Sequence, residues 1–127
     1  MLTLAEADAL FARRRDAWLR EDHDAYLACW AEDMTFGSPV HTVPIRGREA
    51  YARLIRASAQ TVRPLRFAVD HLAVRDDVVL AEWEIEAEHR ASGARLQWRG
   101  MSVAMYRDGL IVWWREYWNP SALGLPA

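Results

Sequence analysis

The sequence predicts an α+β fold, in which helices from the first half of the chain cover a sheet formed by the second half. Two observations support this prediction. Apolar residues recur at helical spacing over 3–20 and 48–60, whereas β-branched and aromatic residues alternate from Leu65 onward. The chain has 127 residues with no repeat or linker, so we expect one domain over 1–127.

Helix-start signals locate the first two helices. Thr3 and Glu6 have the spacing of a capping box at the start of the first amphipathic segment. Asp22 or Asp24 can cap a second helix that continues to Trp30. We therefore expect two consecutive helices near the N-terminus.

The segment between the second and third helices contains a short strand and a loop. The sequence MTFGSPV at 34–40 predicts a strand that breaks at Pro39. A loop with two prolines follows from Gly37 to Gly47, and an apolar stripe predicts the third helix over 48–60.

Four strands follow, separated by turn signals of the hairpin type. These signals are RDDV at 75–78, ASGA at 91–94 and RDGL at 107–110. We expect an antiparallel meander with strands at 65–75, 78–90, 95–107 and 110–118.

Tight turns fix which residues share a face of this sheet, because side chains alternate along a strand. Between the first three strands of the meander, two-residue turns place His71 opposite Glu82, Arg99 opposite Glu86 and Met101 opposite Glu84. In the last hairpin, the same kind of turn places Met101 beside Glu116 and Val103 beside Trp114. One face then holds His71, Glu82, Glu84, Glu86, Arg99, Met101, Val103, Met105, Val112, Trp114, Glu116 and Trp118. The other holds Trp83, Ile85, His89, Leu96, Trp98, Ser102, Ala104, Tyr106, Ile111, Trp113, Arg115 and Tyr117.

Both faces are rich in large apolar groups, and the chain has seven tryptophans. The helices can cover one face, so the other is expected to form a homodimer interface. The aromatic residues assigned to that interface are Trp83, Trp98, Trp113 and Tyr117.

Charge and composition exclude several partners. The net charge is -2, with acidic and basic residues interspersed, so we expect no binding to nucleic acid or to a membrane. Cys29 is the single cysteine, no signal peptide is evident, and no apolar stretch reaches the ~20 residues of a membrane helix, so we expect a cytoplasmic protein. The scattered histidines have no metal-ligand spacing, and we expect neither a metal nor a cofactor.

The element order and two motifs resemble the nuclear-transport-factor-two-like superfamily and its SnoaL-like members. The motifs are DMTFGSPVHTVPIRGREAY at 33–51 and DGLIVWWREYWNP at 108–120. The resemblance covers nearly the whole chain. It implies that three helices and a curved antiparallel sheet form a cone, a cystatin-like α+β barrel, with a pocket between helices and sheet.

The resemblance also implies which reactions are disfavoured. At the positions of the ketosteroid isomerase Asp, Tyr and second Asp, this chain has Ser38, Arg14 and the segment 101–103, so steroid isomerisation by that mechanism is not expected. The REYWNP motif at 115–120 resembles phenazine-biosynthesis A/B proteins and SnoaL-like cyclases, whose acid–base Glu aligns with Glu116. Limonene epoxide hydrolases have an Asp at the equivalent position, but the rest of their Asp-Arg-Asp set has no match here.

Glu116, Glu84 and His71 are the candidate catalytic residues. Between Trp114 and Trp118, Glu116 would be desolvated, which raises its pKa toward neutrality and suits acid–base catalysis. The alternative is a structural salt bridge with Arg99 or another cation, which would keep Glu116 ionised. Glu84 would lie near Glu116 and share its proton, unless the row of glutamates is a solvated strand edge. His71 suits a general base but is equally a core histidine.

A second group of residues would form the substrate pocket; each alone is more typical of plain core packing, and the set as a whole favours a cavity. Arg99 is either a counter-ion or an oxyanion donor, and His41 either rims the pocket or lies on the surface. The candidate substrate-binding residues are Trp114, Trp118, Trp30, Ser38, His41, Tyr51, Leu54, Ile55, Arg99, Met101, Val103 and Met105.

Three functions remain open. The first is a cofactor-independent isomerase, cyclase or hydratase acting on a small hydrophobic substrate, with an epoxide hydrolase of the limonene type as a variant. The second is a non-catalytic protein that binds a small ligand in the same pocket. The third is a dimeric partner whose cone is filled by side chains.

Overall fold

The first half of the chain forms three helices in the computed structural model, which describes residues 1–125. Helix α1 (Leu4–Leu19) starts with the predicted capping box: the Glu6 N–H donates to Thr3 Oγ1 at 3.1 Å, and the Thr3 N–H donates to Glu6 Oε1 at 3.0 Å. Helix α2 (His23–Leu27) is capped by Asp22, and α3 spans Arg48–Thr61. The predicted extension of the second helix to Trp30 is wrong, because Trp30 begins a strand.

Six strands form one curved sheet in the order β2-β1-β6-β5-β4-β3. The predicted loop from Gly37 to Gly47 contains an additional strand that pairs with β1, and β1 runs parallel to β6. The strands are β1 (Trp30–Ser38), β2 (His41–Arg46), β3 (Val62–Arg75), β4 (Val78–His89), β5 (Arg95–Arg107) and β6 (Leu110–Trp118), and a short 3-10 helix η1 (Pro120–Leu123) follows. The α+β class is confirmed, with a sheet that is antiparallel except for this one pair.

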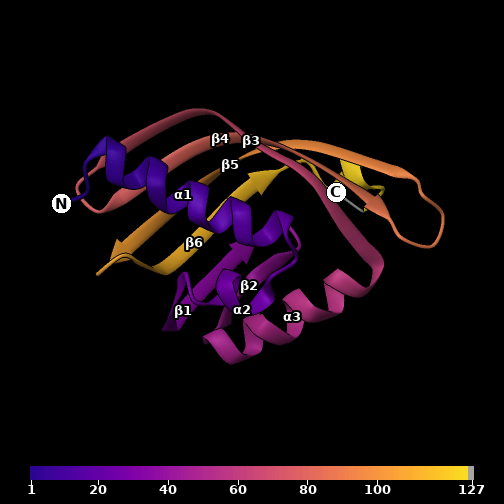
Figure 1. Ribbon diagram of the computed structural model, residues 1–127, viewed down its shortest axis with the longest axis horizontal. Helices are drawn as coiled ribbons and strands as arrows, with labels where there is room; N and C mark the ends of the chain where they lie inside the picture. The colour runs from indigo at the N-terminus through magenta and orange to yellow at the C-terminus, as the bar shows by residue number, and fades with distance from the viewer. Residues whose placement is uncertain (126–127) are drawn as a thin grey trace.

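The helices lie on one face of the sheet, as Figure 1 shows. Helix α1 crosses the face formed by β3 to β6, while α2 and α3 lie at the end where β1 and β2 extend the sheet. The centre of the core contains Trp30, Met34 and Trp114, whose side chains have no exposed surface. The cone expected from the family resemblance is therefore present, and its interior faces α1.

The pairing of β4 with β5 is shifted by two residues from the predicted register. A four-residue loop at 90–93 replaces the predicted two-residue turn, because the His89 N–H donates to the Ala94 carbonyl. Arg99 therefore pairs with Glu84 rather than with Glu86. A shift of two preserves the alternation, so the relative faces of β4 and β5 remain as predicted.

A β-bulge in the last hairpin reverses the predicted faces of β4 and β5 relative to β6. Tyr106 pairs with Ile111, but Met105 pairs with Trp113, so Val112 is an extra residue in β6. Beyond the bulge, Ala104 rather than Val103 lies opposite Trp114. A slip of one residue exchanges inside and outside, so the predicted pocket face of β4 and β5 is in fact the outer face.

The bulge also corrects the predicted dimer interface. Trp83 is buried inside the monomer with 1 % exposure, and Trp98 packs against the same core. Trp113 and the exposed Tyr117 pair with Met105 and Met101 on the outer face. The pairing of two copies through an outer sheet face remains a prediction, but Trp83 and Trp98 cannot contribute to it.

Candidate functional site

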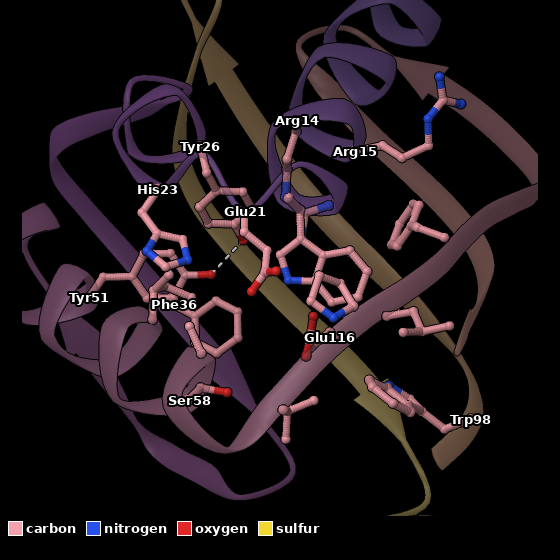
Figure 2. A pocket seen from close by; sticks show the side chains of 17 residues that line it. Arg14, Arg15, Glu21, His23, Tyr26, Phe36, Tyr51, Ser58, Trp98 and Glu116 are labelled. Carbon is pink, nitrogen blue, oxygen red and sulfur yellow. Dashed lines mark hydrogen bonds between the residues drawn. The ribbon is translucent and has the colours of Figure 1, made fainter. Parts of the chain in front are cut away.

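The interior of the cone contains a cavity of about 210 Å³ between the three helices and the inner face of the sheet. Its wall is mostly aromatic and aliphatic, and Figure 2 shows Arg14 and Glu116 entering it from opposite sides, from α1 and from β6. A third expected function, a partner whose cone is filled with side chains, is not supported, because the cone has space for a ligand.

Glu116 is fixed in the cavity by the two tryptophans that flank it on β6. The Trp114 Nε1–H donates to Glu116 Oε2 at 2.9 Å, and the Trp118 Nε1–H donates to Oε1 at 3.0 Å. The three side chains share one face because they alternate along the strand. Burial raises the pKa of Glu116 above its ordinary value of 4.5, while the two indole N–H groups and the charge of Arg14 oppose this rise.

Arg14 places a buried positive charge in the same cavity. Its side chain is 8 % exposed, and its Cζ lies 4.1 Å from the ring centroid of Trp114. Tyr26 and Phe67 complete an aromatic surround at 5.4 and 5.5 Å. Its Nε has no hydrogen-bond partner. Within residues 1–125, no carboxylate lies within 4.0 Å of this guanidinium.

Two tyrosines add neutral hydroxyl groups to the wall. The hydroxyl oxygens of Tyr26 and Tyr51 are 2.9 Å apart, as the dashed line in Figure 2 shows. Burial raises the pKa of Tyr51 well above its ordinary value of 10.0, so its hydroxyl stays protonated. One hydroxyl of the pair donates to the other, which leaves the second hydroxyl with a proton to donate to a ligand.

The mouth of the cavity is bordered by an ion pair between distant segments. Glu21 has a positive φ of 58° in the turn between α1 and α2, and its carboxylate pairs with Arg90 of the β4–β5 loop. The Arg90 Nε also donates to the Ala59 carbonyl of α3 at 2.8 Å. His23 also lines the cavity. These contacts connect three elements around the entrance.

Some of the residues predicted for the site do lie in it or directly behind it. Glu116, Tyr51 and Ile55 line the cavity. Trp114 and Trp118 do not line the cavity themselves, but their indole N–H groups donate to the carboxylate of Glu116, which does. Trp30 and Leu54 belong to the adjoining core, where Trp30 packs against Tyr51 with ring centroids 4.6 Å apart.

The remaining predicted residues lie elsewhere, mainly because of the bulge at Val112. On the outer face, the Arg99 Nη2 donates to Glu84 at 2.8 Å, and this hydrogen bond lowers the pKa of Glu84, so Glu84 shares no proton with Glu116. His71 is highly exposed and contacts Glu82, the pairing that the sequence predicts. The other outer-face residues are Met101, Val103 and Met105.

Ser38 and His41 also lie outside the cavity. The Ser38 Oγ and the His41 Nδ1 are 3.1 Å apart across the turn between β1 and β2. This contact closes the additional hairpin, which the prediction of a loop did not include. Neither side chain lines the cavity.

Sequence analysis missed Arg14 as a site residue, although a signal for it exists. Arg14 occupies the apolar stripe of α1 together with Ala7, Phe11 and Trp18. A charged residue on the buried face of a helix needs a partner or a function. Tyr26, Phe67 and Trp98 were also missed, and their residue types alone do not distinguish a cavity wall from ordinary core.

Across residues 1–125, no group of three or more His, Cys, Asp and Glu side chains could hold a metal ion. Over the same residues, none of the helices has the length and hydropathy needed to span a bilayer.

Comparison with known proteins identifies the family. None of the curated proteins matches this sequence. Among solved structures, the chain is similar to a candidate isomerase from Bacillus subtilis, with 23% identity over 96% of this chain and 92% of that one and a TM-score of 0.85. An LEH-like epoxide hydrolase from M. tuberculosis gives 24% identity over 93% and 86%, with a TM-score of 0.79. A candidate polyketide cyclase from Xanthomonas campestris gives 22% identity over 94% of both chains, with a TM-score of 0.77.

These likenesses establish the fold and, at such identities, no particular reaction. The family model described as the SnoaL-like domain matches residues 11–114, a segment that begins in α1 and ends within β6. The resemblance found in the sequence is thereby confirmed: the chain belongs to the SnoaL-like domain family of the nuclear-transport-factor-two-like fold.

Proposed function

We propose that this protein is a cofactor-independent enzyme that moves protons on a small hydrophobic carbonyl, enol or epoxide substrate, as an isomerase, cyclase or hydratase. The observation that carries the proposal is the carboxyl of Glu116, which is held inside an apolar cavity by two indole N–H groups. Burial raises the pKa of this carboxyl, so it keeps its proton to a higher pH than an ordinary glutamate, which favours acid–base catalysis.

The geometry supports a single group acting alternately as acid and base. Each carboxyl oxygen of Glu116 accepts one indole N–H, so its remaining lone pairs or its proton are available on the cavity side. Glu116 removes a proton from a substrate carbon or water, and returns a proton at a second position. Arg14 adds a positive charge to the same cavity, where it favours negative charge on the bound substrate.

The test compares Glu116→Gln with the matched variant Glu82→Gln, which alters a carboxylate on the outer face. Small cyclic enones and epoxides are assayed for isomerised or hydrated products. Loss of the acid–base group should lower kcat by about 10²–10⁴-fold, whereas Glu82→Gln should retain wild-type rates. Equal rates for wild type and Glu116→Gln would remove Glu116 from the mechanism.

Titration of tryptophan fluorescence gives a check that needs no substrate. Protonation of Glu116 changes its contacts with Trp114 and Trp118, so the wild type and Glu82→Gln should show a transition centred above 4.5. The Glu116→Gln variant should lack that transition. A transition that survives in Glu116→Gln would assign the titration to another group.

A second candidate function is ligand binding without catalysis. It is favoured by the restraint on Glu116, since both of its oxygens already accept hydrogen bonds, as those of a structural carboxylate do. A binding protein would show the fluorescence transition and bind ligands, but would give no product with any substrate class. Hydrolysis of the limonene type is less favoured, because Glu21, the other carboxylate at the cavity, is paired with Arg90.

A further inference from the structure

The guanidinium of Arg14 is an unusual group to bury without a partner. Transfer of a charge out of water costs free energy that buried ion pairs and hydrogen bonds normally offset. Here the Nε has no hydrogen-bond partner, and the rings of Trp114, Tyr26 and Phe67 lie around the cation. Cation–π attraction offsets only part of the desolvation cost. Glu116 acts on this charge only across the cavity, so the described residues give the guanidinium no direct ion pair and leave its Nε without a hydrogen bond.

The cavity in front of Arg14 has the size and wall of a site for a ring-shaped ligand. A cavity of roughly 150 Å³ holds one benzene molecule, and the cavity here has about 210 Å³. Phe36, Phe67 and Trp98 give it flat aromatic walls. The space beyond one ring is sufficient for a small polar substituent.

We propose that the cavity recognises a small cyclic carboxylate, whose anionic group pairs with the buried, unpartnered guanidinium of Arg14. A planar carboxylate matches the fork of a guanidinium, and the free proton of the Tyr26–Tyr51 hydroxyl pair provides a further donor. The proposal names a substrate class and rests on the proposed function only in taking this cavity as the ligand site. The ring of the ligand then lies against the aromatic walls, within reach of Glu116.

The test measures benzoate and its neutral isostere benzamide by calorimetry at neutral pH. Wild-type protein should bind benzoate at least about tenfold more tightly than benzamide, because a hydrogen bond to a charged group is worth at least one factor of ten. The Arg14→Met variant should lose that preference while it still binds benzamide. Arg20→Met is the matched control, since Arg20 is an exposed arginine at the end of the same helix, and it should retain the preference.

Several outcomes would overturn the proposal. They are equal binding of the two probes by the wild type, no binding of either, or a benzoate preference that persists in Arg14→Met. Arg14→Met should melt at the same or a higher temperature than the wild type, because the substitution removes a buried charge. A lower melting temperature together with lost binding would show that Arg14 is structural and would also overturn the proposal.

The two proposals can fail separately. Glu116→Gln keeps Arg14 intact, so it should still prefer benzoate even when turnover and the fluorescence transition are lost. Suppose that the wild type shows Glu116-dependent turnover but binds benzoate no more tightly than benzamide. The proposed function would then stand, and the proposal that the ligand is a carboxylate would be wrong.

Discussion

Glu116 and Arg14 influence each other's charge across the cavity. Burial makes the ionised form of Glu116 costly, whereas the cation of Arg14 and the two indole N–H groups favour that form. The net effect is a raised pKa, so Glu116 retains its proton to a higher pH in the folded protein than in the unfolded chain. This difference makes the stability of the fold depend on pH.

The wild type should lose stability relative to Glu116→Gln as the pH rises from 4.5 to the folded-state pKa of Glu116. In that window Glu116 binds more protons in the folded state than in the unfolded state, so the free energy of unfolding falls as the pH rises. Above the folded-state pKa, Glu116 contributes no further change. The loss is about 1.4 kcal/mol for each pH unit between the two pKa values. Urea unfolding at a series of pH values measures it. Glu82→Gln is the control, and a parallel pH dependence in wild type and Glu116→Gln would contradict the assignment.

The sequence allowed only some of the residues that form the site to be predicted. Glu116 between two tryptophans was identifiable because strand alternation puts all three on one face, whichever face that is. Arg14 was identifiable only as a charged residue on the apolar stripe of α1, because the lack of a hydrogen-bond partner for its Nε is visible only in the three-dimensional structure.

At the scale of elements, one extra residue in β6 decides which side chains meet the cavity. Capping residues and turn signals predicted the helix starts and the strand limits to within a few residues. The bulge at Val112 has no comparable local signal, since the extra residue looks like any other member of an apolar strand. The faces of the sheet were consequently assigned the wrong way round for β4 and β5.

Gly100 provides a test of how closely β5 packs against the Trp83 side chain and the backbone of β6. A Cβ at Gly100 would lie 2.7 Å from the Tyr117 carbonyl oxygen and 2.8 Å from the ring of Trp83. Gly100→Ala should therefore destabilise the protein by about 1–3 kcal/mol. Gly37→Ala is the control, because a Cβ there meets Arg115 at an ordinary 3.6 Å. Equal free energies of unfolding for the two variants would show that the Trp83 ring can move aside.

At the scale of the whole molecule, the entrance to the cavity is held by contacts between segments far apart in sequence. The Arg90 side chain joins Glu21 of the α1–α2 turn to Ala59 of α3. Neither the family resemblance nor the periodicity indicates this connection, because it depends on the relative positions of three separate elements. Arg90 therefore ties the α1–α2 turn, the β4–β5 loop and α3 together beside the cavity.

Arg90→Gln should loosen the entrance without unfolding the domain. Amide hydrogen exchange should accelerate in 20–24 and 58–61, while the free energy of unfolding changes by less than about 1 kcal/mol, as expected for a partly exposed ion pair. Arg107→Gln, which removes the pair with Asp33 at 3.0 Å outside the mouth, is the control. Unchanged exchange in Arg90→Gln would show that other contacts hold the entrance.

The parallel pairing of β1 with β6 also has a consequence for the synthesis of the protein. Phe36 in β1 pairs with Trp114 in β6, so β1 receives its inner neighbour only after β2 to β5 have been synthesised and β6 has emerged. Pairing between such distant segments is slow to form because a long loop must close first. Until then β1 and β2 form an isolated hairpin with an unpaired edge. A nascent chain that stalls before β6 would therefore carry an aggregation-prone edge, and chaperone demand should peak while β3 to β5 are being synthesised.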